Sequence, residues 1–235
     1  MKKLIYVADD DLNICNIIKL FLTDAGYDVE TFETGELLLE AFKEKASDLV
    51  LLDIMMPGKD GLTICKEIRE FSTVPIIMLT AKDSELDYVA GISVGSDDYL
   101  TKPFKPTVLT MRVKAIFRRI EIERTHKNQE SSSKDIINFG DLEFKIGERL
   151  LMCKNKEVPL TVTEVNVVLY MLNMGKNAVS REQLLEAIWG FDADVETRVT
   201  DETIRRIRKK LLEANSNVKI KTVWGFGYKL VISEG

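Results

Sequence analysis

Four stretches of this 235-residue chain carry polar side chains that could together hold a metal ion and a phosphoryl group. Each side chain stands at the end of a short apolar run. In chain order they are Asp9, Asp10 and Asp11, then Asp53, Thr80 and Lys102. Converging carboxylates repel one another, and ligands made only of oxygen suit a hard divalent cation such as Mg²⁺ or Mn²⁺. A hydroxyl and an ammonium beside them could bind the oxygens of a phosphoryl group.

Taken singly, these residues have simpler interpretations. The aspartate triplet and Asp53 could each cap a helix, Thr80 could merely end a strand, and Lys102 could be a solvated side chain. Their positions relative to the expected secondary structure decide between the two interpretations.

Apolar runs alternate with amphipathic segments throughout the first half of the chain. The paired runs are 4–8 and 12–25, 27–32 and 35–46, 49–52 and 62–71, 75–79 and 84–94, and 99–101 and 108–119. Five such units predict a doubly wound α/β domain with a five-stranded parallel sheet. Because parallel strands present their carboxyl ends at one edge, where such sheets bind ligands, we expect the polar side chains to converge there.

The motifs around these residues resemble the receiver domain of bacterial two-component response regulators, which has a flavodoxin/CheY-like fold. They are ADDD at 8–11, LLDIMMPGKDG at 51–61, PIIMLTAKD at 75–83 and GSDDYLTKPF at 95–104. The resemblance implies that Asp53 accepts a phosphoryl group from a sensor histidine kinase. It also implies that Asp9, Asp10, Asp53 and the backbone carbonyl of Met55 bind Mg²⁺.

The same resemblance implies a switch and a dimer interface. Thr80 and Lys102 would bind the phosphoryl oxygens, and Tyr99 would be the aromatic residue that turns inward on activation. Charged residues that resemble the family's dimer contacts are Asp97, Asp98, Arg112 and Arg119, although each could be ordinary surface charge. Tyr88 and Val108 replace a common basic and acidic pair, so we expect an apolar contact there.

Residues 122–135 lose periodicity and become polar, which predicts a flexible linker between domains at 1–121 and 136–235. Short strand-like runs follow, and two helix starts then fit the capping box: Thr161 to Glu164 and Ser180 to Gln183. A basic amphipathic segment at 198–212 precedes a hairpin at 218–232. This order predicts an α+β winged helix-turn-helix domain.

The basic segment has two faces when drawn as a helix. Thr200, Ile204, Ile207 and Leu211 share the face expected to be buried. The opposite face carries Arg198, Arg205, Arg206 and Lys209, with Glu202 among them. A solvated basic face is the usual interpretation, but this layout favours a helix that enters the major groove of double-stranded DNA.

The second half resembles the effector domain of OmpR/PhoB regulators, through LTVTE at 160–164, VSREQLLEAIWG at 179–190 and KTVWGFGYK at 221–229. Glu202 and Thr203 depart from the residues frequent in that family, and Trp224 replaces a wing arginine. We expect Thr203, Thr222 and Trp224 to belong to the DNA-binding set with the basic face. The resemblance also implies that loop 189–197 contacts RNA polymerase. Three motifs, GLTIC at 61–65, PIIMLT at 75–80 and KTVWGFGYK at 221–229, further resemble VanR-type regulators of glycopeptide resistance.

Composition and charge fit two domains with different tasks. Residues 1–121 hold 15 Lys+Arg and 21 Asp+Glu, or −6, whereas 136–235 hold 15 and 14, or +1. The three cysteines are widely spaced and odd in number, which argues against a disulfide framework. The apolar run at the start is too short for a signal peptide or a membrane span. We therefore expect a cytoplasmic protein without a membrane partner.

The expected function is a response regulator. Phosphorylation of Asp53 would promote a homodimer that binds repeated DNA half-sites and controls transcription, of glycopeptide-resistance or cell-envelope genes if the VanR resemblance holds. We expect no enzymatic activity beyond self-phosphorylation and autodephosphorylation. Two alternatives are a regulator that binds DNA without phosphorylation and an aspartyl-phosphate phosphotransferase of the haloacid dehalogenase type. The first alternative is disfavoured because the complete set is present: Asp9, Asp10, Asp53, Thr80 and Lys102. The second is disfavoured because the lone Asp follows the third expected strand and not the first.

Overall fold

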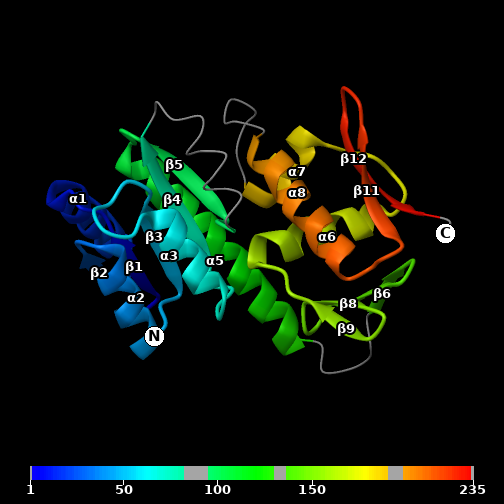
Figure 1. Cartoon of the computed structure of the whole chain (residues 1–235), viewed down its shortest axis with the longest axis horizontal. Coiled ribbons are helices and arrows are strands. Elements are labelled where there is room, and N and C mark those ends of the chain that lie inside the picture. Colours follow the sequence, from blue (N-terminus) through cyan, green and yellow to red (C-terminus); the bar gives the residue numbers. More distant parts are fainter. Residues whose placement is uncertain (1, 82–94, 130–135, 190–197, 234–235) are drawn as a thin grey trace. The chain divides into compact units, whose positions relative to one another are not determined.

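The computed structural model describes residues 2–81, 95–129, 136–189 and 198–233 (Figure 1). The chain forms two compact units, Met1–Lys114 and Ala115–Gly235. Each unit is described separately. In the described part of the chain, no helix is both long enough and apolar enough to cross a membrane.

The first unit contains the expected five-stranded parallel sheet, with strand order β2-β1-β3-β4-β5. The strands are β1 (Leu4–Ala8), β2 (Asp28–Phe32), β3 (Leu49–Asp53), β4 (Ile76–Ala81) and β5 (Asp98–Lys102). All five residues of β3 are buried, as the continuous apolar run predicts for a central parallel strand. The expected doubly wound fold is confirmed.

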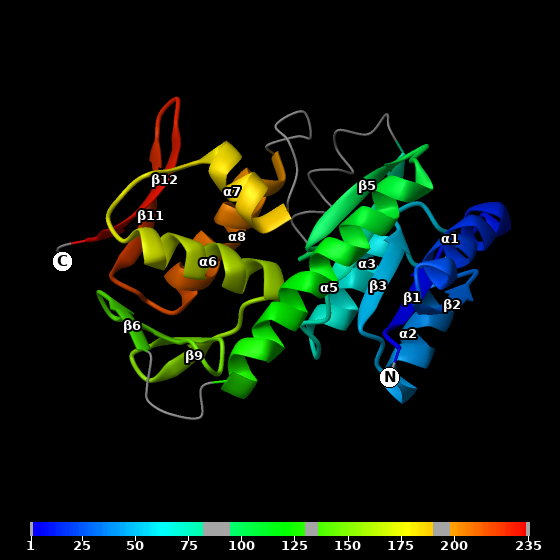
Figure 2. The same cartoon turned by 180° about the vertical axis from the view of Figure 1, so that it is seen from behind.

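Helices cover both faces of this sheet. Those described are α1 (Leu12–Asp24), α2 (Gly35–Glu44), α3 (Gly61–Arg69) and α5 (Pro106–Gln129). Figures 1 and 2 show α2 and α3 on one face, with α1 and the first part of α5 on the other. Asp11, Thr34 and Asp60 cap the first three helices through side-chain oxygens. The helix expected at 84–94 lies outside the described residues.

Helix α5 runs through 122–129, so our expectation of a flexible linker there is wrong for those residues. The stretch is rich in Glu, Arg, Lys and Gln, which favour helix even without an apolar stripe. Residues 130–135 lie outside the description, and the domain limits at 121 and 136 stay a prediction.

From residue 136 onwards, the described part of the second unit forms a four-stranded antiparallel sheet, three helices and a three-stranded sheet. The first sheet contains β6 (Ile136–Phe139), β7 (Leu142–Lys145), β8 (Leu150–Cys153) and β9 (Lys156–Val158). The helices are α6 (Val162–Met174), α7 (Arg181–Trp189) and α8 (Arg198–Glu213). The second sheet, with strand order β10-β12-β11, contains β10 (Val179–Ser180), β11 (Val218–Val223) and β12 (Gly227–Ile232). Figure 1 shows β11 and β12 projecting as a hairpin, the wing of a winged helix.

Both expected capping boxes are present. The Thr161 backbone N–H donates to Glu164 at 2.9 Å, and the Glu164 N–H donates to the Thr161 hydroxyl at 3.4 Å. Ser180 and Gln183 exchange the equivalent bonds at 2.9 and 3.0 Å. These starts fix where α6 and α7 begin and thereby orient the packing partners of α8. The three cysteines are free and buried, as expected.

Gly61 begins α3 directly against the strand that carries Asp53. A Cβ atom at Gly61 would lie 2.0 Å from the carbonyl oxygen of Asp53 and 3.1 Å from Cα of Ile54. The Gly61 N–H also donates to the carbonyl of Ile54 at 3.1 Å. The close approach of two backbone segments, and not an unusual φ angle, therefore requires glycine here.

We expect Gly61→Ala to lower the free energy of unfolding of the first unit by roughly 2–3 kcal/mol, since backbone must move to admit the methyl group. Gly26→Ala is the control, because Gly26 has a φ of 97° but nothing within 4 Å of the added atom. Gly26→Ala should lower the free energy of unfolding by about 1 kcal/mol, the cost of backbone strain alone. Urea unfolding measures both, and a smaller loss for Gly61→Ala than for Gly26→Ala would contradict the steric argument.

Candidate functional site

The strand ends bring the expected polar side chains to one edge of the sheet. Asp9 follows β1, and Asp53 and Lys102 are the last residues of β3 and β5. Thr80 precedes the last residue of β4. The registers pair Asp53 with Leu79 and Thr80 with Thr101, so these ends lie level with one another. The convergence predicted from the sequence is therefore present in the fold.

Lys102 lies between two buried carboxylates. Its Nζ is 2.6 Å from Oδ2 of Asp9 and 3.0 Å from Oδ1 of Asp53. Asp9 is 0% exposed and Asp53 4%, whereas Asp10 is exposed. The Lys102–Pro103 peptide bond is cis. The site is thus a charged, mostly buried cluster that is open to solvent on the Asp10 side.

Burial raises the pKa of Asp53 to about 6, against the lowering effect of the Lys102 hydrogen bond and charge. For Lys102, burial alone would lower the pKa, but the hydrogen bonds to Asp9 and Asp53 outweigh it and the pKa is raised. Lys102 therefore stays charged at neutral pH, and Asp53 is ionised in most molecules.

The two residues of the expected switch are both buried. Thr80 is 2% exposed and Tyr99 is 6% exposed. Tyr99 lies on β5 opposite Met78 of β4, and its backbone N–H donates to its neighbour Asp98 at 2.8 Å. The tyrosine ring is therefore already part of the core in this conformation.

The expected dimer residues need one correction. Asp97 is 1% exposed, and its Oδ2 accepts from Arg69 Nη2 at 2.7 Å and from the Ile76 N–H at 3.0 Å. Arg69 also donates to the carbonyl of Gly95 at 2.8 Å. Asp97 thus joins the start of β5 to α3 and β4, and our prediction of a surface contact for it is wrong. No sequence motif pointed to Arg69 as its partner.

The same correction applies to Asp98 and Arg112, which are 4% and 6% exposed and bind each other, since Arg112 Nη1 donates to Asp98 Oδ1 at 2.5 Å within the same chain. Val108 is partly exposed and stays a candidate. Tyr88 and the Arg119 side chain lie outside the described residues.

Helix α8 buries the predicted apolar face, since Thr200, Ile204, Ile207 and Leu211 are each at most 3% exposed. On the opposite side, Arg205 and Lys209 are exposed. Glu202 holds Arg205 through contacts of 2.6 Å to Nε and 2.5 Å to Nη2. The Arg198 side chain lies outside the description.

Two residues of α8 that were expected to contact DNA are buried instead. Thr203 is 0% exposed and Arg206 is 7% exposed. Arg206 donates to the Thr203 hydroxyl at 3.2 Å and lies 3.6 Å from Oε1 of Glu164, which also binds Lys210 at 2.6 Å. The buried carboxylate of α6 attracts both cations, so our prediction that Thr203 and Arg206 contact DNA is wrong. Glu164 was identified from the sequence only as a helix cap.

The wing is tied to α8 by an arginine that the sequence reasoning did not single out. Arg208 donates from Nε to the Ile220 carbonyl and from Nη2 to the Thr222 hydroxyl, both at 2.9 Å. The Thr222 hydroxyl therefore already has a hydrogen-bond partner within the unit. Trp224, at the turn of the hairpin, is 92% exposed.

Tyr228 forms the centre of a second contact between α7, α8 and β12. Arg181 and Arg208 lie 5.0 and 5.5 Å from the centre of its ring, and its hydroxyl donates to Asp201. Burial and that hydrogen bond raise the pKa of Tyr228 to about 12. The tyrosine stays protonated at neutral pH, so its bond to Asp201 persists.

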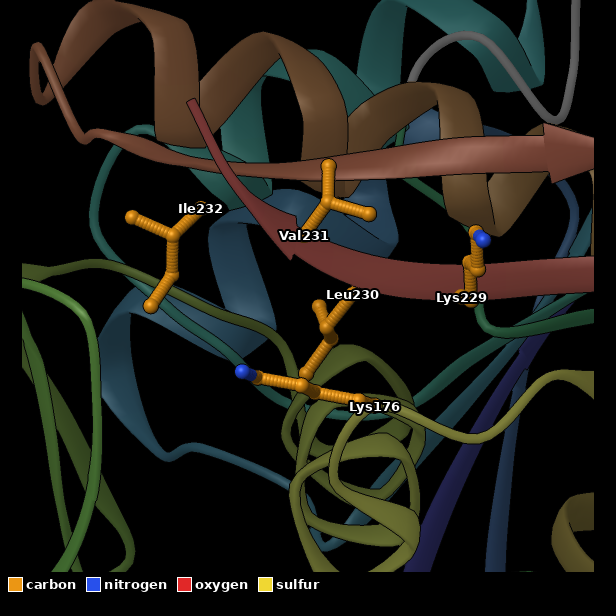
Figure 3. A pocket seen from close by; sticks show the side chains of 5 residues that line it. All are labelled: Lys176, Lys229, Leu230, Val231 and Ile232. Carbon is orange, nitrogen blue, oxygen red and sulfur yellow. The ribbon is translucent and has the colours of Figure 1, made fainter. Parts of the chain in front are cut away.

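A cavity of about 430 Å³ lies along β12 and is lined by Lys176 and by the four residues Lys229 to Ile232. Figure 3 shows that the two lysine side chains do not converge on a common point. The lining combines two lysines with apolar side chains and holds no carboxylate to pair with either lysine, so this cavity shows no paired acid and base.

Comparison with known proteins matches both units. A model described as "Response regulator receiver domain" covers residues 5–114, and one described as "Transcriptional regulatory protein, C terminal" covers 155–230. The chain is 39% identical over 236 residues to the alkaline phosphatase synthesis transcriptional regulatory protein PhoP of Bacillus subtilis. That alignment covers 98% of this chain and 97% of PhoP. The chain is a two-component response regulator of the OmpR/PhoB family.

Two further matches agree with this assignment. The regulator is 38% identical over 232 residues to regulatory protein VanR of Enterococcus faecium, with 98% of this chain and 99% of VanR covered. A crystal structure of DrrB, a Thermotoga maritima OmpR/PhoB homologue, superposes with a TM-score of 0.51 at 34% identity. It covers 98% of this chain and 100% of DrrB. Since PhoP and VanR match almost equally, overall identity does not single out a VanR-type regulator.

Receiver domains generally bind Mg²⁺ in an acidic pocket, and the residues of this regulator fit such an ion. Oxygens of Asp9, Asp10 and Asp53 lie within 4.8 Å of one another. Three carboxylates and the Lys102 ammonium carry a net charge of −3 + 1 = −2, which a divalent cation would neutralise. The Met55 carbonyl stays a prediction.

We expect Asp53→Asn to stabilise the metal-free regulator at pH 7. The pKa shift from 3.8 to about 6 already includes the favourable Lys102 contact and corresponds to roughly 3 kcal/mol, so we expect a gain of about 2–3 kcal/mol. As pH falls from about 6 to 4, folded Asp53 takes up its proton first, so wild type regains stability and the gain disappears. Urea unfolding at several pH values measures this.

Added Mg²⁺ should stabilise wild type more than Asp53→Asn, because the variant lacks one carboxylate ligand. Asp28→Asn, at an exposed position of β2, is the control and should change neither response. A stability gain for Asp53→Asn that is equal at pH 4 and pH 7 would contradict the argument.

Proposed function

We propose that phosphorylation of Asp53 by a sensor histidine kinase switches this regulator into a dimer that binds repeated DNA half-sites. The observation that carries the proposal is the position of Lys102, within 3.0 Å of both Asp9 and Asp53 at the carboxyl edge of the sheet. That arrangement supplies a nucleophile, a fixed positive charge and metal ligands in one place.

In the proposed reaction, an oxygen of ionised Asp53 attacks phosphorus, and the bond from phosphorus to the kinase histidine breaks. Phosphoryl transfer depends mainly on positioning and charge stabilisation. Asp9 and Asp10, with Asp53, would hold Mg²⁺ (or Mn²⁺), which neutralises charge on the phosphoryl oxygens. Lys102 supplies a second positive charge, and its raised pKa keeps it protonated throughout.

The proposed switch uses Thr80 and Tyr99. A phosphorylated Asp53 adds acceptor oxygens, so the Thr80 hydroxyl gains a partner and moves towards it. The space beside Tyr99 then changes, and the packing of its ring follows. The proposed dimer face includes Val108, Tyr88 and Arg119, and loop 189–197 is proposed to contact RNA polymerase.

The proposed DNA-binding surface is the exposed side of α8 together with the wing. Arg205 and Lys209 supply positive charge, with Arg198 expected beside them. Glu202 restrains Arg205 and could accept from a cytosine amino group, which makes it a candidate for sequence preference. Trp224, exposed on the wing, is proposed to contact the DNA as well, and Thr222 would support the wing through Arg208.

The setting and the targets are also part of the proposal. Three free, buried thiols suit a reducing cytoplasm. Glycopeptide-resistance or cell-envelope genes remain the predicted targets. An aspartyl-phosphate phosphotransferase is disfavoured, because the proposed nucleophile follows β3 and not β1.

Asp53→Ala should abolish labelling by acetyl phosphate, because the variant lacks the attacking carboxylate. Asp60→Asn is the matched control in the same loop, since asparagine can keep the cap on α3 that Asp60 forms with the Thr63 N–H at 2.7 Å. Labelling is measured by mass spectrometry, and sedimentation velocity follows the oligomeric state. Equal labelling of wild type and Asp53→Ala, or a monomer before and after labelling, would contradict the proposal.

Lys209→Ala should weaken binding to duplex DNA and reduce the slope of log affinity against log salt concentration by about 1, the value expected for one lost phosphate contact. Lys156→Ala, at an exposed position of β9, is the control and should leave the slope unchanged. Fluorescence anisotropy with labelled DNA at several salt concentrations makes the measurement. An unchanged slope for Lys209→Ala would remove this residue from the proposed surface.

A further inference from the structure

The loop that follows Asp53 is closed at its base and exposed at its tip. At the base, the Gly61 N–H donates to the Ile54 carbonyl at 3.1 Å, and Asp60 caps α3. The tip, Pro57 to Lys59, is exposed. The base is therefore fixed by β3 and α3, whereas the tip needs another contact to have one conformation.

Glu36, in the first turn of α2, supplies that contact. Its Oε1 accepts from the Lys59 backbone N–H at 2.8 Å. Gly58, with a φ of 82°, lies so close that an added Cβ would be 2.7 Å from the same oxygen. The hydrogen bond from Lys59 lowers the pKa of Glu36, so the accepting group is a carboxylate at neutral pH.

The first turn of α2 also contacts the buried part of this loop. A Cβ atom at Gly35 would lie 3.2 Å from Cε of Met56 and 2.4 Å from Cγ1 of Ile64. Met56 is 7% exposed, whereas its neighbour Met55 is 64% exposed. Two adjacent residues of α2 thus contact the loop on both sides of Pro57.

We propose that Glu36 is a positioning residue for phosphoryl transfer: it holds the tip of loop 54–60 and thereby preorganises that loop for metal binding beside Asp53. The consequence for metal binding rests on the proposed function, because the Met55 carbonyl is its expected backbone ligand. A loop held in one conformation loses less entropy when the ion binds, so the ion binds more tightly.

Three variants separate this role from general stability. Glu36→Ala removes the acceptor, whereas Glu36→Gln keeps an acceptor oxygen and should restore most of the effect. Glu67→Ala is the matched control, because the Glu67 carboxylate contacts Lys59 at the side-chain Nζ, at 2.6 Å, and its removal leaves the backbone bond to Glu36 in place.

Hydrogen exchange of the full-length, metal-free protein gives the first readout. The Lys59 amide should exchange roughly three- to tenfold faster in Glu36→Ala, as expected for the loss of one hydrogen bond, and at the wild-type rate in Glu67→Ala. The second readout is the Mg²⁺ concentration that gives half-maximal acetyl phosphate labelling. It should rise by a similar factor in Glu36→Ala, with the maximal rate preserved.

Wild-type exchange at Lys59 in Glu36→Ala would overturn the proposal, as would an unchanged Mg²⁺ requirement. A lower maximal labelling rate at saturating Mg²⁺ would also contradict it, since a positioning role acts through metal affinity. If wild type itself takes up no phosphoryl group, the proposed function fails, whereas the exchange result still decides whether Glu36 holds the loop.

Discussion

The ion pair of Lys102 with Asp9 and Asp53 is the interaction on which the receiver unit depends. Two buried carboxylates can lie this close together only while the Lys102 ammonium stays between them, since a buried charge left without a partner costs several kcal/mol. The strands that carry them must therefore end level with one another. Loop 54–60 and the first turn of α2 lie at the same edge of the sheet. Residues that are distant in the sequence must therefore all be placed correctly at this edge.

The second unit also depends on a buried charge cluster, but there one carboxylate contacts two cations. The Glu164 carboxylate contacts Lys210 and Arg206, and it also caps the start of its own helix, α6. The bonds that cap α6 thus also fix how α8 is rotated about its axis. The exposed side of α8 is consequently decided by the interior of the unit and not by the residues that face solvent.

Sequence periodicity was sufficient to predict the sheet of the first unit and the edge at which the polar residues meet. A run such as Leu49 to Leu52 has few alternatives to a central strand, and the strand order then places Asp53, Thr80 and Lys102 together. The buried face of α8 followed in the same way from the 3.6-residue period. The capping boxes were equally predictable from the sequence, because both partners of each box lie within one helical turn.

The predictions that failed involve partners far apart in the chain. Asp97 binds Arg69, 28 positions away. A helical wheel places Arg206 on the polar face of α8, but the buried carboxylate of Glu164, which also binds Lys210 46 positions away from it, holds Arg206 inside the unit. The segment 122–129 failed for a different reason, since helix propensity alone supports a helix that has no apolar stripe.

The two tryptophans of this chain lie in opposite environments. Trp189, at the end of α7, is 1% exposed, whereas Trp224 on the wing is 92% exposed. A dissolved quencher therefore reaches one indole and not the other, and the red-shifted part of the emission belongs to the wing. The regulator thus carries an intrinsic optical label at an exposed point of its second unit.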